Sequence, residues 1–151
     1  MRIGVISDTH GLLRNEAVAA LQGVDHILHA GDVGDFSIVD ALKKIAPVTA
    51  IRGNVDIHGD CAKLPATEAV ELGGKLFYLV HSVYDLDLKP EAAGIACVVS
   101  GHSHKPEIAE RNGVLYLNPG SAGPRRFSLP VSLAHVLIQD GTIRTELVEL
   151  L

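Results

Sequence analysis

Short apolar runs alternate with amphipathic segments in the first third of the chain. Residues 2–7, 26–29 and 48–51 are rich in aliphatic and β-branched side chains, which predicts strands. Two intervening segments carry apolar residues at helical spacing: Leu13, Ala17, Val18 and Leu21 in the first, and Ile38, Ala41, Leu42 and Ile45 in the second. Asn15 is the expected cap of the first helix, and the second ends before Pro47. This βαβαβ alternation predicts a parallel sheet.

The pattern changes in the second half, where pairs of apolar runs are separated by two-residue turn signals. The turns are Gly73-Gly74, Asn112-Gly113 and Asp140-Gly141, flanked by residues 68–72 and 75–80, 108–111 and 114–117, and 131–139 and 142–150. Such dipeptides favour hairpins, so a more antiparallel sheet is predicted here. A short helix is expected at residues 90–93, because Pro90 suits a first helical turn. Residues 1–151 are expected to form a single domain.

Polar side chains follow nearly every apolar run directly. They are Asp8 and His10, Asp32, Asn54 and Asp56, His81, and His102 and His104. In open α/β sheets, ligands gather at the carboxyl ends of the strands. His102 and His104 follow the buried-looking run of residues 96–99, and in an extended segment both imidazoles would lie on the same side.

Seven of these residues form a mixed set of oxygen and nitrogen donors. The set is Asp8, His10, Asp32, Asn54, His81, His102 and His104. Carboxylates, an amide and imidazoles suit Mn, Fe, Ni, Zn or Co, whereas the nitrogens make Mg less suitable. Seven donors are too many for one tetrahedral site but are enough for two adjacent ions with one bridging carboxylate. His102 and His104 would then serve neighbouring ions.

Each of these residues alone has a structural interpretation, such as a helix cap, a turn or a buried histidine. Their coincidence across several strand ends favours the metal site. The remaining histidines are interpreted as structural: His26, His29, His58 and His135. Among them, His29 is a candidate to support a ligand, because it lies three residues before Asp32.

Charge and composition exclude several classes of function. The formal net charge of −5 argues against a surface for duplex nucleic acid. No apolar run approaches the ~18 residues of a membrane span, and the first residues lack the pattern of a signal peptide. Cys61 and Cys97 are isolated, which fits a reducing cytoplasm. A homo-oligomer is compatible with the sequence.

Five blocks occur in a characteristic order: Asp8-Thr9-His10-Gly11, Gly31-Asp32, Gly53-Asn54-Val55-Asp56, His81-Ser82 and Gly101-His102-Ser103-His104. Together they resemble the signature of the calcineurin-like metallophosphoesterases. The stretch Leu117-Asn118-Pro119-Gly120-Ser121 is similar to the compact microbial phosphodiesterase branch. The resemblance covers residues 2–125 and implies an α/β fold (α+β in some schemes) with two packed β-sheets flanked by helices, a four-layer α-β-β-α sandwich.

The resemblance also implies a centre of two divalent ions per chain at one edge of the sheets. Mn is the preferred metal, with Ni, Fe, Zn, Co or Mg as alternatives. One ion is assigned to Asp8, His10, Asp32 and His104, and the other to Asp32, Asn54, His81 and His102, with Asp32 as the bridge.

The expected activity is hydrolysis of small phosphodiesters by in-line attack of a hydroxide that bridges the two ions. The expected catalytic residues are Asp32, Asn54, Asp56 and His81, with Asp56 orienting Asn54 or a neighbouring ligand. The expected substrate contacts are Asn54 and Arg125, with Arg126 beside it.

The chain departs from the family pattern at two positions. Val55 stands where the family often has a histidine, and Ser82 stands where glycine is common. The valine puts efficient monoester hydrolysis in doubt. The alternative function is a non-catalytic scaffold with the same fold, which the complete donor set disfavours. A nucleotide-binding Rossmann module is excluded, because no Gly-x-Gly-x-x-Gly follows the first run.

Overall fold

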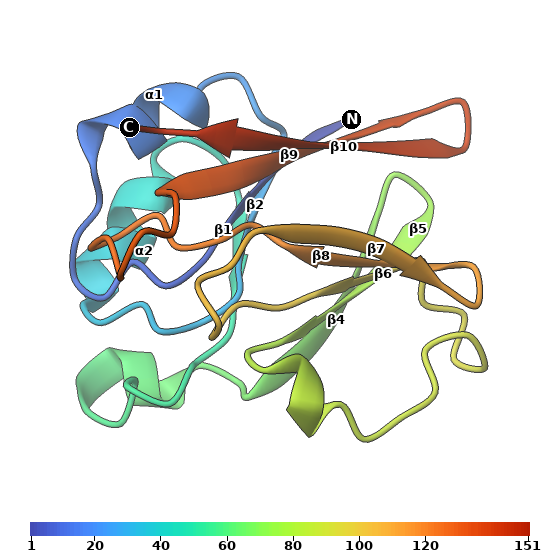
Figure 1. Cartoon of the computed structure of the whole chain (residues 1–151), viewed down its shortest axis with the longest axis horizontal. Coiled ribbons are helices and arrows are strands. Elements are labelled where there is room, and N and C mark those ends of the chain that lie inside the picture. The colour runs from blue at the N-terminus through green and yellow to red at the C-terminus, as the bar shows by residue number, and fades with distance from the viewer.

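The computed structural model describes residues 1–151 and contains ten strands and two α-helices (Figure 1). The strands are β1 (Arg2–Ile6), β2 (His26–His29), β3 (Val48–Ala50), β4 (Thr67–Leu72), β5 (Lys75–Val80), β6 (Cys97–Val99), β7 (Glu107–Arg111), β8 (Val114–Asn118), β9 (Ser132–Gln139) and β10 (Thr142–Glu149). The helices are α1 (Asn15–Ala20) and α2 (Phe36–Lys43), and two short 3-10 helices are η1 (Gly59–Lys63) and η2 (Val83–Asp85).

The first sheet has the strand order β10-β9-β1-β2-β3. Strands β1, β2 and β3 run parallel to one another, as the βαβαβ alternation predicts, and β3 lies at one edge of the sheet. The C-terminal hairpin of β9 and β10 joins this sheet antiparallel to β1. Gly4 allows α1 to pack closely on β1, because a Cβ at this position would collide with the side chain of Leu21.

The second sheet has the order β4-β5-β6-β8-β7 and is mixed. Its hairpins β4-β5 and β7-β8 are antiparallel as predicted, and both residues of the Gly73-Gly74 and Asn112-Gly113 turns have positive φ. However, β5, β6 and β8 run parallel, so the prediction of a more antiparallel sheet was wrong for its centre. The turn dipeptides specify only pairs that are adjacent in the sequence, whereas β6 lies between strands from two different hairpins.

Two local predictions also differ from the structure. Asn15 is the first residue of α1, and the cap is Arg14, whose side chain makes no capping hydrogen bond. Residues 90–93 form a turn instead of a short helix. The Ile95 N–H returns to the carbonyl of Pro90, and Gly94 has a φ of 74°, which ends the turn before a helix can propagate.

Three apolar clusters hold the layers together. The space between the sheets is filled by side chains from both, including Val5, Leu28, Phe77 and Val99. The two α-helices pack on the outer face of the first sheet and lie together on the left in Figure 1. The outer face of the second sheet is covered by the segment from η2 to Ile95. The predicted α/β fold of two packed sheets is confirmed, and its fourth layer consists of this segment, which contains no α-helix.

This topology directs the parallel strands of both sheets towards one site. The chain leaves β1 and β2 of the first sheet at Asp8 and Asp32, and leaves β5 and β6 of the second sheet at His81 and His102. The structure contains no helix with the length and apolar character needed to cross a membrane.

Candidate metal centre

Two groups of acidic and imidazole side chains lie where the two sheets meet. The first comprises Asp8, His10 and His104, and the second comprises Asp32, His81 and His102. Within each group, the potential ligand atoms all lie within 4.8 Å of one another. Each group combines residues from both sheets, so the packing of one sheet on the other is what assembles them.

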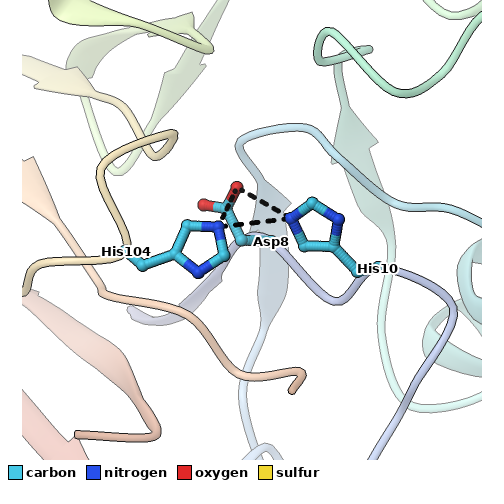
Figure 2. Close-up of side chains that lie close together, drawn as sticks. All are labelled: Asp8, His10 and His104. Carbon is cyan, nitrogen blue, oxygen red and sulfur yellow. Dashed lines mark hydrogen bonds and ion pairs between the residues drawn. The ribbon is translucent and has the colours of Figure 1, made fainter. Parts of the chain in front are cut away.

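The first group surrounds one carboxylate oxygen (Figure 2). Asp8 Oδ1 lies 3.6 Å from Nε2 of His10 and 3.4 Å from Nε2 of His104. The two imidazole Nε2 atoms are 3.2 Å apart. Three donor atoms therefore converge on one point from the loops that follow β1 and β6.

Asp32 connects the two groups. Its Oδ2 lies 3.1 Å from Nε2 of His81, in the second group, and 3.5 Å from Nε2 of His10, in the first. Asn54 lies beside the second group, with its Oδ1 3.1 Å from Nδ1 of His102. The structure thus brings together all seven residues of the predicted donor set, with Asp32 in the middle.

Several buried polar atoms of the centre have no hydrogen-bond partner. They are Asp8 Oδ1, His81 Nε2 and His104 Nδ1. By contrast, Asp8 Oδ2 accepts hydrogen bonds from the Ser7 hydroxyl at 2.8 Å and from the backbone N–H of His102 at 3.0 Å. A buried polar atom without a partner costs about 1–3 kcal/mol. Oxygen and imidazole donors left free in this way fit a divalent transition metal.

The hydrogen bonding of His81 prepares its free nitrogen for a cation. Nδ1 lies 2.7 Å from the carbonyl oxygen of Ala30. A carbonyl can only accept, so Nδ1 carries a proton, and Nε2 is the ring nitrogen that faces Asp32. This arrangement of a histidine held by a backbone carbonyl is typical of metal ligands.

The charges at the centre shift the pKa values of its members in opposite directions. Burial raises the pKa of Asp8, but the adjacent imidazoles of His10 and His104 and the charge of His81 outweigh burial, so the pKa lies well below its usual value. Burial likewise raises the pKa of Asp32, which His81 and the Val55 N–H bring below its usual value. Burial lowers the pKa of His81, but Asp32 and the Ala30 carbonyl raise it overall. Both carboxylates are therefore ionised at neutral pH, the state that binds cations.

The candidate ligands have unusual backbone conformations. Asp8, His10, Asp32, His102 and His104 all have φ between 46° and 72°, in the left-handed region. This region costs free energy for residues other than glycine and is concentrated at functional sites. The positive φ values also correct the expectation that residues 102–104 form an extended segment with both imidazoles on one side. The segment is not extended, so His102 and His104 do not share one side, and their rings enter different groups.

Glycines allow the loops to approach the carboxylates closely. A Cβ at Gly53 would collide with the side chain and backbone of Asp32, and a Cβ at Gly101 would collide with Ser7 and Asp8. Glycine is therefore required for steric reasons before Asn54 and before His102, because the loops that carry these residues pass directly over the two aspartates.

Asp56 contacts backbone amides and none of the candidate ligand atoms. It is buried and accepts hydrogen bonds from the N–H groups of Val33 at 3.0 Å, Gly34 at 2.9 Å and Gly53 at 2.9 Å. Its carboxylate thereby ties the loop after Asp32 to the loop that carries Asn54.

His29 is fully buried and links the first two strand-end loops. Its Nδ1 accepts from the Gly31 N–H at 3.1 Å, so its Nε2 donates to the Thr9 hydroxyl, also at 3.1 Å. The Thr9 hydroxyl in turn donates to the carbonyl of Val33 at 2.9 Å. Burial lowers the pKa of His29 to about 4, which keeps the ring neutral. The other histidines interpreted as structural contribute to neither group.

Sequence reasoning did not assign roles to Ser7 and Asn118. Ser7 donates to Asp8, as described above. Asn118 donates from Nδ2 to the carbonyl of Gly101 at 3.0 Å and to the Ser103 hydroxyl at 3.1 Å, so it holds the loop of His102 and His104. The available signal was a polar residue at the end of an apolar run, the same pattern that identified the ligands.

The predicted substrate contacts lie in different places. Asn54 is exposed and lines a hollow of about 510 Å3 together with Arg52, His81 and His102. Arg125 and Arg126 are exposed and belong to neither ligand group, and Arg125 donates to the carbonyl of Leu129 at 3.2 Å. Val55 is 41% exposed and donates its backbone N–H to Asp32 Oδ1 at 3.0 Å.

Comparison with known families is consistent with this geometry. The model of the calcineurin-like phosphoesterase superfamily domain matches residues 1–141. The chain belongs to this superfamily. A probable metallophosphoesterase of Methanocaldococcus jannaschii is 37% identical over 153 aligned residues, covering 93% of this chain and 77% of that protein.

Two solved structures share the fold of this chain. An archaeal phosphodiesterase has a TM-score of 0.80 at 23% identity, with 98% of this chain and 100% of that chain covered. Vacuolar protein sorting 29 of Cryptosporidium parvum has a TM-score of 0.76 at 22% identity, with 98% and 96% covered. At these identities the likeness shows the fold alone, which both an enzyme and a sorting protein use.

Proposed function

We propose that the chain is a dimetal-dependent phosphodiesterase that hydrolyses small phosphodiesters, with residues 1–151 acting as one catalytic domain. The observation that carries the proposal is the environment of Asp8 Oδ1. This oxygen is buried, has no hydrogen-bond partner, and is faced by Nε2 of His10, His81 and His104 at 3.4–3.9 Å. A cation at this point satisfies the oxygen and turns the adjacent nitrogens into ligands.

The residues that would hold the ions follow the two groups. Asp8, His10, Asp32 and His104 would hold one ion, and Asp32, Asn54, His81 and His102 would hold the other. Mn is the preferred metal, and Fe, Co, Ni, Zn and Mg are the alternatives to test. Two such ions, when bound, activate a water for in-line attack and polarise the phosphoryl oxygen.

The protein's own residues prepare this reaction in three ways. His81 is fixed through its proton on Nδ1, so that Nε2 stays available beside Asp32. Asp56 and His29 hold the loops of the two aspartates in their left-handed conformations. Asn54, exposed beside His102, would contact a phosphoryl oxygen that enters the adjoining hollow.

The choice of a diester over a monoester rests on Val55. Its side chain can neither donate a proton nor hydrogen-bond to a leaving oxygen, so leaving groups that need little protonation are favoured. Arg125 is proposed only as a substrate contact at the periphery, because it lies outside both ligand groups. The two cysteines are free, and a reducing cytoplasm is the proposed compartment.

The alternative is a scaffold that binds other proteins, as a member of a sorting complex or as a homo-oligomer. The fold shared with vacuolar protein sorting 29 supports this alternative. The convergence of carboxylate and imidazole donors favours the enzyme, because a scaffold requires no ionised carboxylates buried against imidazoles.

Metal reconstitution tests the proposal directly. The protein is stripped with a chelator, reloaded separately with Mn, Zn, Fe, Co, Ni or Mg, and analysed for bound metal and for hydrolysis of bis-p-nitrophenyl phosphate and p-nitrophenyl phosphate. The expected result is up to two ions per chain and diester turnover that chelation abolishes. Metal content near zero, or turnover indifferent to the chelator, contradicts the proposal and favours the scaffold.

A further inference from the structure

A second hollow adjoins the candidate metal centre. It has a volume of about 270 Å3 and lies between η2, the loop after β6 and the β7-β8 hairpin. We call it the tyrosine hollow, and its residues used below are Ser82, Tyr84, His102, Lys105, Arg111 and Tyr116. His102 belongs both to this wall and to the second ligand group, and Ser82 directly follows His81. A substituent on a phosphorus atom held at the centre therefore has direct access to the hollow.

The tyrosine hollow carries two cations without an acidic partner. Lys105 and Arg111 both line it and are exposed. Glu107 lines the hollow as well, but it does not pair with either cation. The ion pairs of the structure involve only Lys63 and three histidines, so no carboxylate oxygen lies within 4.0 Å of the Lys105 or Arg111 nitrogens. In a chain with a net charge of −5, this local positive charge favours a negatively charged ligand.

Two aromatic rings accompany these cations. Tyr84 is 93% exposed at the edge of the hollow. The guanidinium carbon of Arg111 lies 5.1 Å from the centre of the Tyr116 ring, a cation–π contact that holds the arginine beside the hollow. Exposed aromatic rings beside cationic groups are the combination that binds nucleotides, because the bases stack and the phosphates pair with the cations.

We propose that the tyrosine hollow binds one ester substituent of the substrate, and that this substituent is a nucleoside carrying a phosphate in addition to the scissile one. The base stacks on Tyr84, and the additional phosphate pairs with Lys105 and Arg111. The role in substrate selection rests on the proposed phosphodiesterase function, but binding of the nucleotide itself requires only the hollow. The substrate class is accordingly a phosphodiester in which one ester substituent is a phosphorylated nucleoside.

Calorimetry on the metal-loaded protein tests the inference with three probes. Adenosine 3′,5′-bisphosphate carries both a base and a second phosphate, adenosine 5′-monophosphate lacks the second phosphate, and ribose 5-phosphate lacks both the second phosphate and the base. We expect the dissociation constant of the bisphosphate to be lower than that of either other probe by about tenfold or more. Equal affinity for all three probes overturns the inference.

Single variants separate the two parts of the site. Tyr84→Ala should weaken binding of both adenosine probes about tenfold and leave ribose 5-phosphate unchanged, whereas Tyr84→Phe retains the ring and should bind like the wild type. Lys105→Gln should abolish the advantage of the bisphosphate over the monophosphate. Arg144→Gln, an exposed arginine on β10, is the charge-matched control and should have no effect. If Arg144→Gln and Lys105→Gln weaken binding equally, the effect is general electrostatics and the inference is wrong.

Binding and turnover distinguish the failure of this inference from that of the proposed function. Selective binding of the bisphosphate without hydrolysis of any diester supports the hollow and contradicts the enzyme. Hydrolysis of bis-p-nitrophenyl phosphate together with unselective binding supports the enzyme and contradicts the hollow.

Discussion

Oδ2 of Asp32 lies 3.1 Å from Nε2 of His81, and the other ring nitrogen of this histidine is held by the Ala30 carbonyl. The same oxygen lies 3.5 Å from Nε2 of His10, which belongs to the other ligand group. Asp32 thus lies between a ring that follows a strand of the second sheet and a ring that follows a strand of the first. Its removal should affect both halves of the centre.

Asp32→Ala is expected to lower bound metal well below that of the wild type and to be among the most damaging single changes for turnover. The loss should exceed the ~10- to 100-fold typical when a residue that supports a metal ligand is removed. Elemental analysis and steady-state kinetics measure the two effects. His135→Ala is the control, because His135 contacts the Ala20 carbonyl and lies in neither ligand group. Similar metal content and turnover in the two variants would show that the centre is wrongly assigned.

Val55→His should raise turnover of monoesters and alkyl esters more than that of aryl diesters. An imidazole at this exposed position can assist a poor leaving group, a contribution of ~10²–10⁴-fold in general acid catalysis. Kinetics on matched alkyl and aryl substrates give the ratio, and metal analysis confirms that the variant is loaded. An unchanged ratio means that assistance to the leaving group comes from another residue.

Asp56→Ala should destabilise the protein strongly, because three backbone N–H groups lose their shared carboxylate. Leaving even one of them buried and unsatisfied costs about 1–3 kcal/mol, and hydrogen bonds to a charged acceptor are the stronger kind. Urea denaturation measures the free energy of unfolding, and metal titration should show weakened binding, since the loops of Asp32 and Asn54 are no longer tied together. Asp60→Ala, which removes an exposed carboxylate, should change the free energy of unfolding by less than about 1 kcal/mol. An Asp56 variant as stable as this control contradicts the structural role.

His29 should make the free energy of unfolding depend on pH. Its pKa is about 4 in the folded protein against 6.5 as the ordinary value, so the folded state binds fewer protons between these values. Stability due to His29 is therefore present above about pH 6.5 and falls as the pH drops towards 4, by about 1.4 kcal/mol per unit once His29 is protonated in the unfolded chain only. The difference between wild type and His29→Gln, measured by denaturation at several pH values, isolates this contribution from the opposing one of His81.

His58→Gln serves as the matched control for this measurement, because His58 is exposed. Its unfolding should follow the wild type across the whole pH range. If His29→Gln also keeps the acid dependence of the wild type, burial of a neutral His29 is not the cause of that dependence.

The sequence by itself determined the strands and the hairpins, and it predicted the candidate donor set. Apolar runs and turn dipeptides act locally, so β1, β2, β3 and the three hairpins lie where the pattern predicts them. The candidate donor set could be predicted because ligands of α/β sheets gather at strand ends, and Asp8, Asp32, His81 and His102 follow such ends in the primary structure. The positions of strands, turns and the polar residues that follow them can be read from the order of residues, without knowing which strands become neighbours.

Only the tertiary structure decided how these pieces combine. Packing of one sheet on the other places His104 against Asp8, which lies 96 positions earlier in the chain and in a different sheet. The left-handed backbone at His102 and His104 separates two rings that an extended segment would keep on one side. Asp56 looks like a catalytic carboxylate in the sequence, but the loops that fold around it surround it with N–H groups. The contacts of His104 with Asp8 and of Asp56 with Val33 join residues far apart in the chain, and their energy depends on burial that exists only after the chain has folded.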